Sequence, residues 1–309
     1  MTESNGIAVI GTVFMDIKGF AFDEYDPVGT NIGEIKFVHG GVGRNAAENL
    51  ANIGLPVTFL STVDAGASGD EIISALKSKN IDVSHVFRTK EKGMGMWLAV
   101  LNSDGELCGS ISQQPDLAVF EQYIDSVIET VIKDCSCVVL EIDMSKTIAE
   151  KVLAAAEKAS RPVYAIVGNM SVISANKNLL TKTACFICNN IEAGKLNDVD
   201  FTDVSIEKLL SEIKVIADKF DINSLIITNG ADGAVYYDRT TGMIGHQPAV
   251  KTGVVDSTGA GDAFFSGAVG ALFNGFTIDK ACEFGAVLAS RVIASVQSSV
   301  EHCKDFYKQ

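Results

Sequence analysis

The chain has 309 residues, 47% of them hydrophobic, which is enough for one large α/β domain or two small ones and excludes a disordered protein. Its formal net charge of −14, with no basic patch, argues against nucleic acid as a partner. No apolar run is long enough to span a bilayer, and Met1–Asn5 have neither the basic segment nor the apolar stretch of a signal peptide. We therefore expect no membrane association and a cytoplasmic location.

Strand and helix patterns alternate along most of the chain, which predicts an α/β fold with a mostly parallel central sheet flanked by helices. Residues 7–12 are expected to form the first buried strand. Residues 13–39 interrupt the alternation with glycines and a proline, and only 33–38 have the pattern of a half-exposed strand. The next expected elements are a helix over 46–53, a strand over 57–63 and a helix from Ser68 to about Asn80.

A second interruption follows. Strands over 94–101 and 106–112, joined by Asn102–Gly105, are expected to form a hairpin. We expect this hairpin to join the 33–38 strand in a small separate sheet, a lid built from segments of about 13–39 and 93–113. The alternation then resumes with helices over 119–133, 148–159, 206–220, 260–274 and 278–296, strands over 137–142, 163–167, 184–188 and 224–228, and a hairpin over 234–247. Because no repeat or linker is visible, residues 1–309 are expected to form a single domain with a lid.

The segment 256–267, DSTGAGDAFFSG, places small residues before an apolar run at helical spacing. A glycine-rich turn that enters a helix directs backbone N–H groups and the positive end of the helix dipole at one spot, and so forms an anion site, most often for phosphate. Asp262 is unexpected there, because a carboxylate repels phosphate. It fits if it takes a proton from a hydroxyl that attacks phosphorus, or, alternatively, if it only caps the helix.

A second glycine-rich stretch, 40–46, also precedes a helix. Its pattern Gly41-x-Gly43-x-x-Ala46 imitates the dinucleotide fingerprint of an NAD-dependent oxidoreductase. However, it follows the half-exposed strand rather than the first core strand, and Arg44 and Asn45 are polar where the helix should pack. Close approach of the backbone to a small polar ligand, with a hydrogen bond from Asn45, is the favoured interpretation.

Further polar residues lie where strands end, at the edge at which open α/β sheets bind ligands. They are Asp16, Glu141, Asn189, Glu192 and the turn 228–233. Each has an ordinary alternative: a solvated loop residue for Asp16, internal pairing for Glu141, and a helix cap rather than a water-mediated Mg²⁺ site for Asn189 and Glu192. Their concentration at one edge favours a binding site.

These motifs together resemble the ribokinase-like, phosphofructokinase B-type carbohydrate kinases. Residues 40–51 are similar to the first signature of that family, and residues 256–267 to the second, with Ser257 where threonine is more usual. Asn189-x-x-Glu192 fits the family's Asn-x-x-Glu, and the 228–233 turn fits its nucleotide loop. The match runs in order over nearly the whole chain and implies a ribokinase-like fold with a β-sheet lid, which mediates dimerisation in many members.

The resemblance also implies roles for individual residues. Asp262 would be the catalytic base, and the N–H groups around Gly259, Ala260 and Gly261 would form the anion hole for the transferred phosphoryl group. Sugar hydroxyls would be held by Asp16, Gly41, Asn45 and Glu141. Asn189 and Glu192 would organise phosphate and Mg²⁺, the latter through water at Glu192. ATP would lie along Thr228, Gly230 and Gly233. A monovalent cation, usually K⁺, would lie near Asp256.

The partner implied is a small-molecule sugar or nucleoside. Residues 15–19 together with 40–51 look most like the pseudouridine kinase branch, which phosphorylates a 5′-hydroxyl. Ribose or another nucleoside is the alternative acceptor. A sugar phosphate would require a cluster of cations, for which Lys18, Lys36, Arg44 and Arg88 are the candidates. A non-catalytic ligand sensor on the same fold would have no use for Asp262.

Overall fold

The computed structural model describes residues 6–90, 92–104, 106–295 and 297–308. Three features named above fall on other residues. Met1–Asn5, Gly105 of the expected hairpin turn and Val296, the expected end of the last helix, lie outside the described residues.

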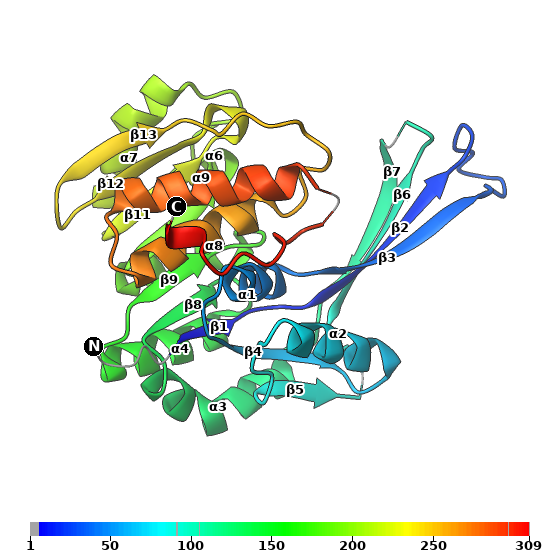
Figure 1. The fold of residues 1–309 in the computed structure, drawn as a ribbon, viewed down its shortest axis with the longest axis horizontal. Coiled ribbons are helices and arrows are strands. Elements are labelled where there is room, and N and C mark those ends of the chain that lie inside the picture. Colours follow the sequence, from blue (N-terminus) through cyan, green and yellow to red (C-terminus); the bar gives the residue numbers. More distant parts are fainter. Residues whose placement is uncertain (1–5, 91, 105, 296, 309) are drawn as a thin grey trace.

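Within the described residues, a nine-stranded sheet forms the centre of the body, in the order β13-β12-β11-β10-β9-β8-β1-β4-β5 (Figure 1). The strands from β11 to β5 are parallel, and β12 and β13 extend the sheet as an antiparallel hairpin. Their bounds are β1 Ile7–Ile10, β4 Val57–Asp64, β5 Val86–Thr89, β8 Cys137–Glu141, β9 Val163–Ile166, β10 Cys185–Asn189, β11 Ser224–Thr228, β12 Ala234–Asp238 and β13 Met243–Gln247.

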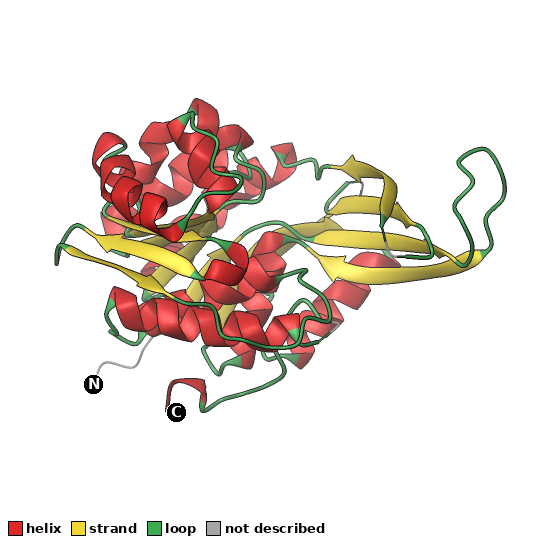
Figure 2. Cartoon of the chain, turned by 90° about the horizontal axis from the view of Figure 1, so that it is seen from above, coloured by secondary structure: helices red, strands yellow, loops and turns green. Residues whose placement is uncertain are grey.

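Helices cover both faces of this sheet (Figure 2). One layer contains α1 Val42–Asn52, α2 Ala67–Ser78, α8 Ala260–Phe273 and α9 Ile278–Ile293. The other contains α3 Ala118–Lys133, α4 Lys146–Ala159, α5 Ser171–Ala175, α6 Asn190–Asn197 and α7 Ile206–Lys219. Short 3₁₀ turns occur at η1 Lys177–Lys182, η2 Gly230–Asp232 and η3 Phe306–Lys308. Because both faces are covered, β1 is apolar at every position: Ile7 and Val9 pack into one core, and Ala8 and Ile10 into the other.

A separate four-stranded sheet projects from the body as an arm (Figure 1). Its order is β3-β2-β6-β7, with bounds β2 Phe14–Ala21, β3 Gly33–Gly40, β6 Gly95–Leu101 and β7 Leu107–Gln113. The expected lid sheet, which joins the hairpin and the 33–38 strand, is therefore present, with β2 between them. The hairpin pairs with β2, and only β2 pairs with β3.

Several elements depart from the sequence-based expectation, among them helix α5, which was not expected. Strand β2 lies in the segment expected to be largely irregular, because pairing on both edges overrides its glycine and scattered charges. Strand β5 and helix α6 were not expected. Helix α1 begins at Val42 rather than at 46, and it buries polar residues that the sequence alone suggested should face a ligand. No helix in the described part of the chain is long and apolar enough to cross a membrane.

Candidate active site

The two glycine-rich stretches meet where α1 packs against α8. The side-chain amide Nδ2 of Asn45 donates a hydrogen bond to Oδ2 of Asp262 over 2.6 Å. One turn further along α8, Ser266 Oγ donates to the backbone oxygens of Asp262 at 2.7 Å and Ala46 at 3.4 Å. The helix–helix contact therefore fixes the Asn45–Asp262 pair relative to the backbone of both helices.

Asp262 lies between these helices and is half-buried as a residue. Burial raises its pKa to about 7, the hydrogen bond from Asn45 and the charge of Arg44 oppose this rise, and Glu192 adds to it. A carboxyl with a pKa near neutrality exchanges a proton readily at physiological pH, which is the property required of a general base.

In the turn before α8, the N–H of Ala260 donates to the oxygen of Ser257 over 3.2 Å, whereas no hydrogen bond between described residues uses the N–H groups of Gly259, Gly261 or Asp262. Gly259, the N-cap residue, has φ +80°, and a Cβ there would lie 2.7 Å from the carbonyl oxygen of Ser298. No side-chain cap from a described residue covers the first turn of α8. A Cβ added at Gly261 would meet no described heavy atom within 4 Å, so the space in front of the turn is open. Unpaired N–H groups at a helix N-terminus next to open space can bind an anion.

Asp256 anchors the loop that leads into this turn. Its Oδ1 accepts a hydrogen bond from Thr258 N over 2.8 Å, and the backbone N–H of Val255 donates to the oxygen of Ile293 at the end of α9 over 2.9 Å. Burial would raise the pKa of Asp256, but the hydrogen bonds from Thr258 and the charge of Lys18 outweigh it, and the pKa is lowered. The carboxylate therefore stays ionised near neutral pH.

Asp16 lies on β2, at the base of the lid, rather than in a loop. It packs so closely that a Cβ on Gly40 would be 2.7 Å from its Oδ2. Burial raises the pKa of Asp16, and the charges of Lys18 and Arg44 partly offset the rise. Gly41, the N-cap of α1 with φ +100°, lies against the carbonyl oxygen of Thr12. The first glycine-rich stretch, β1 and the lid therefore converge next to the Asn45–Asp262 pair.

Glu141 ends β8, and its carboxylate is satisfied from within the chain. Oε2 accepts from Thr12 N at 2.7 Å and Gly43 N at 3.1 Å, and Thr12 Oγ1 lies 2.9 Å from both oxygens. Burial and nearby Asp143 raise its pKa to about 7, against the effect of these donors. Of the two alternatives set out above, internal pairing is therefore present, and direct contact with a substrate stays a prediction.

Asn189 and Glu192 form a capping box on α6. Asn189 Oδ1 accepts from Glu192 N, and Glu192 Oε2 accepts from Asn189 N, both over 2.8 Å. Burial raises the pKa of Glu192. The next strand places Thr228 directly beside Asn189 in register, and the turn with Gly230 and Gly233 follows. These residues share the carboxyl edge of the sheet, and Glu192 is close enough to influence Asp262 electrostatically.

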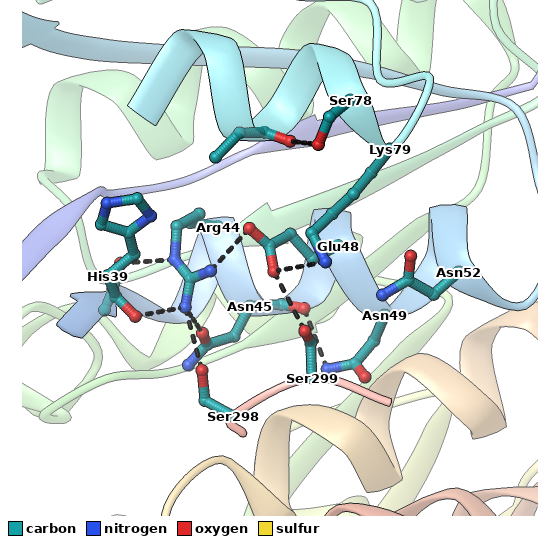
Figure 3. Close-up of polar contacts among 12 residues, drawn as sticks. His39, Arg44, Asn45, Glu48, Asn49, Asn52, Ser78, Lys79, Ser298 and Ser299 are labelled. Carbon is teal, nitrogen blue, oxygen red and sulfur yellow. Dashed lines mark hydrogen bonds and ion pairs between the residues drawn. The ribbon is translucent and has the colours of Figure 1, made fainter. Parts of the chain in front are cut away.

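Arg44 and Glu48 of α1 form a buried ion pair, with Nη1 and Oε1 2.7 Å apart (Figure 3). The sequence motifs assign neither residue a catalytic role. The i, i+4 spacing was a visible signal, but the sequence could not show that both side chains are buried. Asp143 was also missed. It accepts hydrogen bonds from the backbone N–H groups of Gly168, Asn169 and Met170 and so shapes the loop after β9.

Comparison with known proteins identifies the family. The sequence profile described as pfkB family carbohydrate kinase matches residues 4–302. The chain belongs to this family. It is 38% identical over 296 residues to a guanosine-inosine kinase of Exiguobacterium acetylicum, a match that covers 96% of this chain and 97% of that protein. It is 25% identical to the pseudouridine kinase of Escherichia coli K12, covering 95% and 92% of the two chains.

The fold comparison agrees. The ribokinase of Arabidopsis thaliana, solved with ribose and ATP, superimposes with a TM-score of 0.84 at 20% identity, covering 99% of this chain and 98% of that one. The predicted ribokinase-like fold and kinase activity are therefore confirmed. The protein is an ATP-dependent phosphotransferase that acts on an alcohol group of a small-molecule sugar or nucleoside.

Proposed function

We propose that this kinase phosphorylates the 5′-hydroxyl of a ribonucleoside, with Asp262 as the general base. The observation that carries the proposal is the Asn45–Asp262 pair, held at 2.6 Å beside the open glycine turn of α8. In the reaction, the acceptor oxygen attacks the γ-phosphorus of ATP as its proton passes to Asp262. The bond between that phosphorus and the bridging oxygen breaks, and ADP leaves.

The remaining predicted residues divide between the two substrates. Asp16, Gly41 and Asn45 would hold the acceptor, because Asn45 binds Asp262, Gly41 is the N-cap of the same helix, and Arg44 is close enough to influence both Asp16 and Asp262 electrostatically. Glu141 would support them, because it orients the backbone of Thr12 and Gly43. The N–H groups of Gly259, Ala260 and Gly261 would stabilise the charge that develops on the transferred phosphoryl group.

At the other end of the site, Thr228, Gly230 and Gly233 would lie along ATP, with Asn189 and Glu192 next to its phosphates. The donor set fits Mg²⁺ bound through water: the capping box uses Oε2 of Glu192, and oxygen ligands suit this ion. When bound, Mg²⁺ would neutralise phosphate charge. Asp256 would hold a monovalent cation, K⁺, since its carboxylate remains ionised beside the anion turn.

A phosphorylated acceptor fits this site poorly. Of the four candidate cations, Arg44 is 3% exposed and already ion-paired. Arg88 pairs with Asp70, and Lys36 with Glu34. Among the described ion pairs, Lys18 alone of the four has no partner, and a single lysine is a weak phosphate site compared with an arginine cluster. This supports a neutral acceptor.

The lid favours a nucleoside over free ribose. Trp97 on β6 lies directly opposite Asp16 on β2 in register, so both side chains stand on the same face of the lid, and Trp97 is half-buried. If Asp16 binds the ribose of a nucleoside, the nucleobase would lie within reach of the Trp97 indole ring. Aromatic side chains stack on nucleobases. The 38% identity to a guanosine-inosine kinase supports a purine base, and the motifs of residues 15–19 and 40–51 support pseudouridine.

The test is ADP release from Mg·ATP, with K⁺ present, for guanosine, inosine, pseudouridine, uridine, ribose and fructose 6-phosphate. We expect turnover with guanosine and inosine to exceed that with ribose, and the Trp97→Ala variant to lose the advantage of nucleosides over ribose. Faster turnover with pseudouridine than with the other nucleosides would also support the proposal and would assign the protein to the pseudouridine kinase branch. Turnover with fructose 6-phosphate alone, or with ribose at the rate of every nucleoside, would refute it.

We further propose that the protein forms a homodimer through the lid. Phe37, Ile17, Leu98 and Ile111 form one row across all four strands, on the face opposite Asp16. Phe37, Leu98 and Ile111 are 67%, 41% and 70% exposed. A contiguous apolar row on an exposed sheet indicates an interaction surface. Phe37→Ser together with Ile111→Ser should shift the sedimentation coefficient from dimer to monomer, and a monomeric wild type would contradict the proposal.

A further inference from the structure

Arg44 engages all three guanidinium nitrogens with groups of the chain itself (Figure 3). Nε donates to the oxygen of Gly40 at 2.9 Å, Nη1 pairs with Glu48, and Nη2 lies 2.6 Å from the oxygen of His39 and 3.1 Å from Ser298 Oγ. Nη2 also donates to Oδ1 of Asn45. Arg44 is 3% exposed. Its donors are thus directed at the protein rather than at a ligand.

The contact with Asn45 has a chemical consequence. A guanidinium can only donate hydrogen bonds, so the amide must turn its oxygen toward Arg44 and its nitrogen toward Asp262. The nitrogen then binds Oδ2 of Asp262. This contact leaves Oδ1 of Asp262 for an acceptor hydroxyl that approaches from the open side of the turn.

We infer that Arg44 is a positioning residue for the reaction, which fixes the orientation of the Asn45 amide and, through it, the carboxylate of Asp262. The inference rests on the proposed role of Asp262 as the base. Without Arg44, the oxygen of the Asn45 amide loses the donor that holds it, so the nitrogen is no longer fixed against the carboxylate of Asp262.

The rest of the network holds Arg44 itself in place. Glu48 binds Nη1 and is fixed by Ser299 Oγ at 3.0 Å and by Lys79 Nζ at 3.5 Å. The charges of Arg44 and Lys79, with hydrogen bonds from Arg44 and Ser299, lower the pKa of Glu48 against the effect of burial, so the ion pair persists. The same guanidinium binds the end of lid strand β3 and the segment at Ser298, whose carbonyl oxygen packs against Gly259. Arg44 therefore connects three parts of the site: the end of lid strand β3 (the lid root), the general base Asp262 through Asn45, and the glycine turn before α8.

A double-mutant cycle between Arg44 and Asn45 tests the inference. Arg44→Lys keeps a cation for Glu48 but cannot donate to Asn45 and to the lid root in the same fork geometry. We expect Arg44→Lys to lower kcat roughly tenfold in the wild-type background and by less than about twofold in the Asn45→Ala background, because the two residues act as one unit. The KM for ATP should not change. An equal loss of kcat in both backgrounds would overturn the inference.

A second variant does not depend on the stability of Arg44→Lys. Asn45→Asp keeps an acceptor toward Arg44 but replaces the donor to Asp262 with a second carboxylate oxygen. We expect it to lose at least as much kcat as Asn45→Ala. Turnover near that of the wild type would overturn the inference. Arg239→Lys, which alters a surface ion pair with Asp221 at the opposite edge of the sheet, is the control for the same chemical change.

Asp262→Asn separates the two proposals. If this variant retains turnover, the proposed base is wrong and the inference falls with it. If it is inactive while Arg44 and Asn45 show independent effects, only the role of Arg44 is refuted.

Discussion

The rate of this kinase should follow the ionisation of Asp262. With a pKa of about 7, the carboxyl is roughly 10% ionised at pH 6, 50% at pH 7 and 90% at pH 8. Because only the ionised form accepts the hydroxyl proton, kcat/KM for the acceptor should rise roughly tenfold from pH 6 to pH 8 and then level off. The assay is initial-rate ADP release at saturating Mg·ATP, measured between pH 5.5 and 8.5.

Two substitutions test whether this pH dependence arises from the Asp262 carboxyl. Asp262→Asn keeps an oxygen for the hydrogen bond from Asn45, so the fold should persist, but the base is lost and the rate should fall by about 10²–10⁴. Asn45→Ala removes a hydrogen bond that favours the ionised carboxyl, so the acid limb of the profile should move to higher pH.

Glu141 is the control, because burial raises its pKa to about 7 as well. Its carboxyl is enclosed by Thr12 and Gly43 rather than open to a substrate, so Glu141→Gln should keep the acid limb that Asp262→Asn abolishes. A wild-type rate that is flat between pH 6 and pH 8, or an acid limb that disappears only in Glu141→Gln, would refute the assignment of the base.

Two further predictions concern stability, and both are measured by thermal or urea unfolding. Gly259→Ala should destabilise the protein by about 1–3 kcal/mol, because residue 259 has a positive φ and the new Cβ would meet the oxygen of Ser298. Gly261→Ala should change stability by less than about 0.5 kcal/mol, because its Cβ would meet no described atom. Equal effects of the two variants would contradict this local geometry. Because the pKa of Glu141 is raised from 4.5 to about 7 on folding, the protein loses roughly 3 kcal/mol as the pH rises through that window. Glu141→Gln should therefore be less sensitive to pH between 5 and 8, and an unchanged pH dependence would show that Glu141 does not titrate there.

Part of the site was predictable because it is encoded in short segments. A glycine turn before a helix determines where backbone N–H groups gather, so residues 256–267 on their own indicate an anion site that contains an unexpected carboxylate. The capping box of Asn189 and Glu192 was likewise visible as an alternative, since its partners lie three residues apart.

The contacts that join these segments were not predictable in the same way. Asn45 and Asp262 are 217 positions apart, and only the packing of α1 against α8 brings them to 2.6 Å. The sequence presented Arg44 as an available cation. Its nearby partners Glu48, Gly40 and His39 lie within five positions, but its contact with Ser298, 254 positions away, depends on packing that no local pattern records.

The sequence by itself determined the alternation of strands and helices, the lid hairpin and the two glycine-rich stretches, because periodicity and turn chemistry are properties of neighbouring residues. Only the tertiary structure decided that β2 is a strand, since its hydrogen bonds go to β3 and β6. It likewise decided that α1 is a buried polar helix, because the buried Arg44–Glu48 pair also has partners from more distant parts of the chain, Lys79, Ser298 and Ser299.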